Sequence, residues 1–140
     1  MSTDTNKRVV RDFFAALAGG DLPRVRALLH PEVVWTIIGD TPVSRAFRGS
    51  DDFAQGILGA VFAPIKVAAG VSVTLTSLIA QADQVVACAQ GNIQGLYGPY
   101  HNTYCHVLTL REGNILANTA YLDTLLIERA LSGRRLVERA

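Results

Sequence analysis

Long apolar runs, basic clusters and an apolar leader are all missing from this chain of 140 residues. No apolar run approaches the roughly 20 residues that a bilayer-spanning helix needs. The first twenty residues carry charges throughout and lack the apolar centre of a secretory signal. No basic run is longer than two residues, as at Arg134-Arg135, and the net charge is +1. We therefore expect neither a membrane partner nor a nucleic-acid partner.

Cysteine, metal-ligand and phosphate-binding patterns are equally sparse. The chain has two cysteines, Cys88 and Cys105, too few for a disulfide framework, so we expect free thiols and a cytoplasmic location. His101 and His106 lie five residues apart on one expected strand and would face opposite sides, which is poor metal geometry. A glycine-rich phosphate loop is absent as well. We expect no metal and no cofactor.

What is present is a globular composition. Hydrophobic residues make up 49% of the chain and charged residues 18%. This length predicts a single domain over residues 1–140, with a tail at 132–140.

The front of the chain shows helical periodicity and the rest shows alternation. Apolar spacing predicts a helix over 4–18, a second one capped by Asp21 with Leu22, Val25, Leu28 and Leu29 buried, and a third one capped by Ser50. The third buries Phe53, Ile57, Leu58, Val61 and Phe62 and ends at Pro64. Strands are predicted at 33–38, 71–80, 85–94, 101–111 and 115–122. Residues 39–49 form either a loop throughout or a loop with a short strand at 46–47. A turn-rich loop is predicted at 95–99, and Asp123 is predicted to cap a last helix. Helices followed by an antiparallel meander predict an α+β fold.

Three stretches of this sequence resemble the SnoaL-like and ketosteroid-isomerase-like branch of the nuclear-transport-factor-two-like superfamily. The first is Val9 to Leu17 followed by Gly20-Asp21-Leu22. The second is Val34-Trp35-Thr36 with Gly39-Asp40-Thr41-Pro42 and Arg48-Gly49, and the third is Glu112-Gly113-Asn114-Ile115 with Tyr121-Leu122-Asp123. The resemblance covers about Asn6 to Leu131. It implies a cone-like barrel, in which three N-terminal helices pack against a strongly curved, mostly antiparallel sheet and enclose a pocket. It also implies a homodimer through the convex sheet face.

The residues that carry catalysis in such enzymes are replaced here. The base position of ketosteroid isomerase falls on Ile37 and its oxyanion-binding tyrosine on Phe13. Its protonated carboxyl falls on His106, or on Cys105 in the alternative register; we prefer His106 because Leu108 and Leu110 then face inward. The resemblance to limonene-epoxide hydrolase places Trp35 and Ala120 at two of that enzyme's site positions, again without its carboxylates.

Strand alternation selects the candidate site residues. His106 shares its face with Asn102 and Tyr104, and Asn118 and Ala120 face inward on the last strand. The small residues Ala87, Ala89 and Gly91 are expected to leave room for a ligand. The candidate catalytic residues are His106 and Asp40; the candidate ligand-binding residues are Trp35, Asn102, Tyr104, Asn118, Phe13, Ile37 and Ala120.

Each candidate also has a structural interpretation. His106 is either an acid/base group or a core histidine with a satisfied hydrogen bond. For Trp35 the preferred role is packing in the wall, and for Asp40 it is a hydrogen bond within its own turn. For Asp123 the preferred role is to cap the last helix. Tyr97, Tyr100 and His101 either close the mouth of the pocket or decorate a turn.

Three functions remain open from sequence. The first is a cofactor-free isomerase, cyclase or hydratase-like enzyme acting on a small, apolar carbonyl compound. The second is a binding protein with the same pocket and no catalysis, and the third is a dimerisation module whose cavity is incidental. The fold alone does not choose between them.

Overall fold

A computed structural model describes residues 1–57, 59, 63–66 and 71–139 of the chain. Its helices are α1 (Thr3–Ala18), α2 (Leu22–Leu28), α3 (Ser50–Gly56) and α4 (Thr124–Ala130). Its strands are β1 (Leu29–Ile37), β2 (Ala46–Arg48), β3 (Val71–Gln81), β4 (Gln84–Gly95), β5 (Gly98–Tyr100), β6 (Thr103–Arg111) and β7 (Asn114–Leu122). The predicted α+β class is confirmed.

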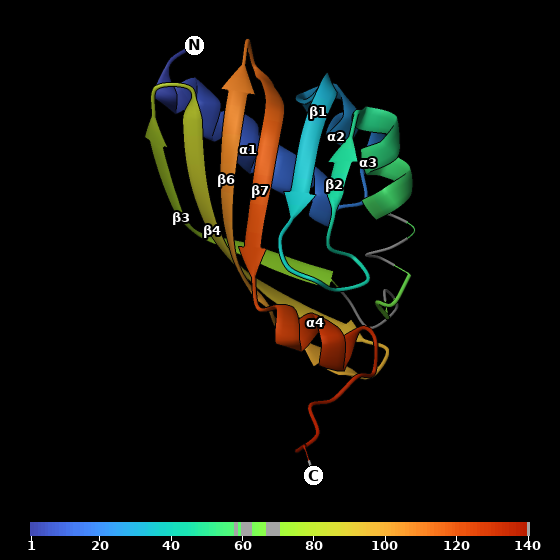
Figure 1. Ribbon diagram of the computed structural model, residues 1–140. Coiled ribbons are helices and arrows are strands. Elements are labelled where there is room, and N and C mark those ends of the chain that lie inside the picture. The colour runs from blue at the N-terminus through green and yellow to red at the C-terminus, as the bar shows by residue number, and fades with distance from the viewer. Residues whose placement is uncertain (58, 60–62, 67–70, 140) are drawn as a thin grey trace.

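The strands form one curved sheet that stays open between its edges. Their order is β2-β1-β7-β6-β4-β3, with β5 paired to β4 beyond this path. Only β1 and β7 run parallel among the described pairs; the other pairs are antiparallel. Helix α1 crosses one face of the sheet diagonally, α3 lies beside β2, and α4 crosses the end where β7 stops (Figure 1). The concave face therefore has helices around it.

The N-terminal helices follow from local sequence signals. Ser2 caps α1 by accepting a hydrogen bond from the Thr5 amide, and Asp21 caps α2 by accepting one from the Arg24 amide. Helix α1 buries Val10, Phe13 and Phe14 against the sheet. The predicted cap at Ser50 is wrong, because Gly49 occupies the cap position with φ 85° and Ser50 is already helical. The predicted buried residues Leu58, Val61 and Phe62 lie outside the described residues.

Two further boundaries differ from the prediction. Strand β1 starts at Leu29, and His30-Pro31 belong to it, because proline is tolerated near the start of a strand and the pairing with β7 is irregular between Leu29 and Val34. The loop predicted at 95–99 instead turns into β5, whose Tyr100 pairs with Ile93. Leu22 is exposed at 38%, whereas Val25, Leu28 and Leu29 are buried as predicted.

The end of the sheet is closed by α4. Asp123 caps this helix by accepting a hydrogen bond from the Leu126 amide, so its predicted structural role is confirmed. The buried side chains Ile127 and Leu131 face the concave side. A Cβ at Gly95 would lie 2.5 Å from the Ala130 carbonyl oxygen, so the glycine allows α4 to sit directly on β4.

Candidate functional site

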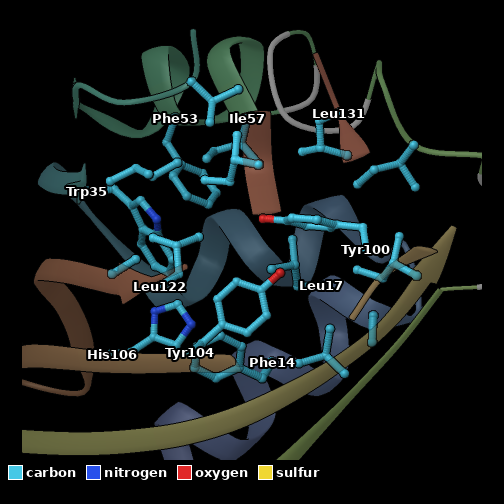
Figure 2. Close-up of a pocket in the computed structure, with 18 residues that line it drawn as sticks. Phe14, Leu17, Trp35, Phe53, Ile57, Tyr100, Tyr104, His106, Leu122 and Leu131 are labelled. Atoms are coloured by element: carbon cyan, nitrogen blue, oxygen red, sulfur yellow. The ribbon is translucent and has the colours of Figure 1, made fainter. Parts of the chain in front are cut away.

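A cavity of about 120 Å³ lies between the concave sheet face and helices α1, α3 and α4. Figure 2 shows aromatic side chains around it, with the hydroxyl oxygens of Tyr100 and Tyr104 directed toward its centre. The described lining comprises Phe14, Leu17, Ala18, Trp35, Ile37, Val43, Phe53, Ile57, Ile65, Val73, Ile93, Tyr100, Tyr104, His106, Ala120, Leu122, Ile127 and Leu131. None of these lining residues carries a carboxylate, an ammonium or a guanidinium.

His106 lies at the centre of an aromatic cluster on β6. Its ring centroid is 4.8 Å from that of Phe14 and 5.7 Å from that of Trp35. The ring of Tyr104 stacks on it at 5.6 Å with an interplanar angle of 11°. The side chain is 6% exposed, and this burial lowers the pKa of His106 to about 4, with a smaller opposing effect from Asn118. The imidazole is therefore neutral at physiological pH.

The orientation of Asn118 assigns the tautomer of His106. Asn118 Nδ2 lies 3.0 Å from His106 Nδ1, so the amide donates and Nδ1 accepts. The reversed amide would bury an unpaired NH₂ group in place of the unpaired Asn118 Oδ1, and orphaned buried donors are rarer than orphaned carbonyl oxygens. An imidazole that accepts at Nδ1 carries its proton on Nε2. On this assignment His106, which lines the cavity, can donate a hydrogen bond only through Nε2.

Asn102 orients the Tyr100 hydroxyl in a similar way, through a hydrogen bond. Its Nδ2 donates to the Tyr100 hydroxyl oxygen at 3.2 Å and to the Asp123 carbonyl at 3.0 Å. Its Oδ1 accepts from the amides of Thr103 at 2.8 Å and Asp123 at 3.0 Å. Because the Tyr100 oxygen already accepts from Asn102, its own proton remains free to donate elsewhere. Burial raises the pKa of Tyr100 and of Tyr104, so both phenols stay protonated.

Five of the sequence candidates meet at the cavity, and four do not. Trp35, Ile37, Tyr104, His106 and Ala120 line it. Asn102 and Asn118 face inward as expected, yet they lie behind Tyr100 and His106 and do not reach the cavity. Phe13 is fully buried one layer back, packed against Phe14 and Trp35 at centroid distances of 5.3 and 5.4 Å. Asp40 is exposed in the loop after β1, outside the described lining.

The small residues of β4 make room for aromatic rings, which corrects the expectation that they leave space for a ligand. Ala87 pairs with His106 and Ala89 with Tyr104 across the sheet. A Cβ at Gly91 would lie 3.2 Å from Cε2 of Tyr104. None of the three is part of the lining. Their small size lets the rings of β6 lie flat on the concave face.

The apolar wall was largely missed by sequence reasoning. Phe14, Leu17, Leu122 and Leu131 line the cavity, and their spacing predicts only that they are buried. The sequence predicts Tyr100 beside a turn-rich loop, whereas this residue is buried on β5 with 3% exposure; Tyr97 and His101 are exposed. Apolar periodicity does not distinguish a cavity wall from a filled core. The short strand β5, which places Tyr100 at the cavity, is not predicted from the sequence.

Two negative findings apply to the described part of the chain. No group of three histidine, cysteine, aspartate or glutamate side chains there is placed to hold a metal ion. No helix of that part is long and apolar enough to cross a membrane.

The lowered pKa of His106 predicts a specific loss of stability in acid. Between pH 6.5 and about 4 the unfolded chain binds a proton at this residue that the folded protein does not bind. The free energy of unfolding should therefore be unaffected by this group above that window and fall by up to roughly 3 kcal/mol across it. His106→Gln should remove this part of the pH dependence in urea titrations, while His101→Gln, at an exposed position, should keep it. Equal pH dependence in wild type and His106→Gln would contradict the assignment.

Solved structures of other proteins share this architecture. An NTF2-like protein of unknown function from Burkholderia pseudomallei K96243 superposes with a TM-score of 0.81 at 23% identity, over 94% of this chain and 99% of that one. An LEH-like epoxide hydrolase from M. tuberculosis gives 0.71 at 19% identity, over 94% and 92%. The ECF RNA polymerase sigma factor SigJ of Mycobacterium tuberculosis (strain ATCC 25618 / H37Rv) is 46% identical over 59 residues, 40% of this chain; these cover 19% of the sigma factor's length. The SnoaL-like domain model matches residues 10–118, so the chain belongs to the SnoaL-like domain family.

Proposed function

We propose that the protein binds a small, uncharged, largely apolar carbonyl compound in the cavity between the sheet and its helices. The observation that carries this proposal is the polarity of the cavity. Tyr100, Tyr104 and His106 bring hydrogen-bond donors to the lining, and the described wall is otherwise apolar apart from the indole N–H of Trp35. A site that presents donors selects a ligand that accepts, such as a ketone, aldehyde or quinone oxygen.

Charge and size narrow the ligand class further. A charged ligand would lose its hydration without gaining a counter-charge from the described lining, which is strongly unfavourable. An apolar cavity of about 150 Å³ binds benzene, and the cavity here has a volume of about 120 Å³. The expected ligand is therefore about one ring in size, or a branched chain of similar volume.

The arrangement supplies the electrophilic half of an acid/base reaction. Donors around a carbonyl oxygen stabilise the negative charge that develops there when the adjacent carbon loses a proton. The described lining contains no carboxylate base, and Ile37 and Ala120 stand there at positions where the resemblance to ketosteroid isomerase and limonene-epoxide hydrolase places one. The low pKa of His106 makes this imidazole a weak base and leaves it the donor role. Asp40, the other catalytic candidate, is exposed and outside the described lining.

The second candidate function is ligand binding without turnover. It is favoured by the lack of a carboxylate in the described lining, and by the match to a sigma factor, a protein whose name indicates transcription. A binding module would use the same three donors for selectivity. Turnover of a carbonyl compound by the purified protein would decide in favour of an enzyme.

A matched pair of probes tests the donor role of Tyr104. Acetophenone and ethylbenzene have similar shapes, and only the ketone accepts a hydrogen bond. Tyr104→Phe should weaken acetophenone binding by roughly 3- to 10-fold, the equivalent of one hydrogen bond, and leave ethylbenzene binding unchanged. Titration followed by NMR measures both affinities. Tyr97→Phe, at a position that is 63% exposed, is the matched control and should change neither. Equal losses for both probes would show that Tyr104 acts only through packing.

We also propose a homodimer through the convex sheet face. Ile79 on β3 and Tyr121 on β7 are 62% and 47% exposed there, and apolar side chains of this size favour a partner surface. Sedimentation at micromolar concentration should show a dimer, and Tyr121→Glu should raise its dissociation constant at least about 10-fold by placing a charge in the interface. A wild-type monomer under these conditions would rule the proposal out.

A further inference from the structure

Two free thiols lie directly opposite each other on the convex face of the sheet. Cys88 on β4 and Cys105 on β6 are paired residues in the antiparallel register, and both side chains are partly exposed in a single protomer. Cys105 also pairs with Tyr121, on the face through which we propose the homodimer, so the reaction proposed below is one of the monomer. Their neighbours Ala87, Ala89, Tyr104 and His106 point to the concave face. Cys105 is thus the residue between two lining side chains of the cavity.

The hydrogen-bond pattern places these cysteines at a closely spaced position. The Gly91 amide donates to the Asn102 carbonyl at 2.8 Å, and the Leu110 amide donates to the Asp83 carbonyl at 2.7 Å. Hydrogen-bonded and non-hydrogen-bonded pairs alternate along an antiparallel ladder. Counting from either bond, with no register shift between them, Cys88 and Cys105 form a non-hydrogen-bonded pair.

This type of pair suits a disulfide. Opposed Cα atoms in non-hydrogen-bonded pairs are about 4.5 Å apart, and their side chains approach more closely than in the other type of pair. Disulfides span Cα separations of roughly 4.4–6.8 Å. The pair therefore lies at the short end of the allowed range, where a disulfide forms with some distortion of the strands.

We propose that Cys88 and Cys105 are a reversible redox pair, which a peroxide closes into a cross-strand disulfide directly behind Tyr104 and His106. No other pairing is available within one chain, since these are its only two cysteines. Adjustment of β4 and β6 to the short bond changes the backbone on both sides of Cys105, and so it moves the aromatic rings that line the cavity. Oxidation on the convex face would then change the shape of the cavity on the concave face.

The chemistry balances with hydrogen peroxide as the oxidant. The thiolate of one cysteine attacks a peroxide oxygen, the O–O bond breaks, and a sulfenic acid and one water result. The second thiol then attacks the sulfenic sulfur, forming the S–S bond and releasing a second water. In total two thiols lose two electrons and two protons, and one peroxide becomes two waters. Thiol reductants reverse the change by exchange through a mixed disulfide.

The surroundings of Cys105 make its oxidation slow. Burial raises the pKa of the Cys105 thiol, and the adjacent Cys88 raises it further. A protonated thiol is a poor nucleophile, so the pair should stay reduced in a reducing compartment and react faster as the pH rises.

The experiment treats the folded wild-type protein, diluted until sedimentation shows a monomer, with hydrogen peroxide and follows thiol content, peptide mass and fluorescence. We expect loss of both thiols, a Cys88–Cys105 linkage within one chain on non-reducing gels and in peptide maps, and full recovery with dithiothreitol. Trp35, the only tryptophan, contacts His106 and should change its fluorescence as the bond forms. Cys88→Ser and Cys105→Ser are the matched controls: neither can form the bond, so neither should show the reversible fluorescence change.

Three outcomes would overturn the proposal. Native protein that keeps both thiols, while unfolded protein forms the linkage, would show that the folded geometry forbids it. Linkage only between two chains would assign the thiols to a dimer contact instead. Intramolecular linkage without any change in Trp35 fluorescence would contradict the connection to the cavity.

Discussion

The hydrogen bond from Asn118 to His106 is the interaction on which the account of this cavity depends. An imidazole enclosed by Phe14, Trp35 and Tyr104 has little water to support a charge, and its pKa falls accordingly. The Asn118 amide then determines which nitrogen of the neutral ring holds the proton. Histidine usually titrates near neutrality. Burial and the Asn118 amide together turn His106 into a hydrogen-bond donor whose proton stays on one nitrogen.

The same arrangement recurs at Tyr100. Asn102 donates a hydrogen bond to the Tyr100 hydroxyl oxygen. Its own amide oxygen accepts hydrogen bonds from the backbone amides of Thr103 and Asp123, and Asp123 is also the N-cap of α4. Two asparagines that never touch the cavity thus orient two of the groups that do. Because α4 also contributes Ile127 and Leu131 to the wall, the end of the cavity and the direction of the Tyr100 hydroxyl depend on one connected set of contacts.

Sequence reasoning reached the fold and part of the site for identifiable reasons. Alternation along β6 placed Tyr104 and His106 inward, because the side-chain period of a strand is fixed and Leu108 and Leu110 set the register. It could not distinguish Asn118 and Asn102, which support the lining, from residues that form it, because both kinds point to the same face. It also could not foresee that Ala87 and Ala89 accommodate rings, since that depends on the cross-strand register with β6. Leu22 and Ser50 show the usual limit at helix ends, where burial and capping depend on tertiary contacts.

Nitrogen-15 NMR of the imidazole ring tests most directly whether His106 is a neutral donor with its proton on Nε2. Nδ1 should show the shift of an unprotonated nitrogen and Nε2 that of a protonated one. This pattern should persist as the pH is lowered, until the ring titrates near the pKa of about 4. A proton on Nδ1, or titration at the ordinary value of 6.5, would contradict it.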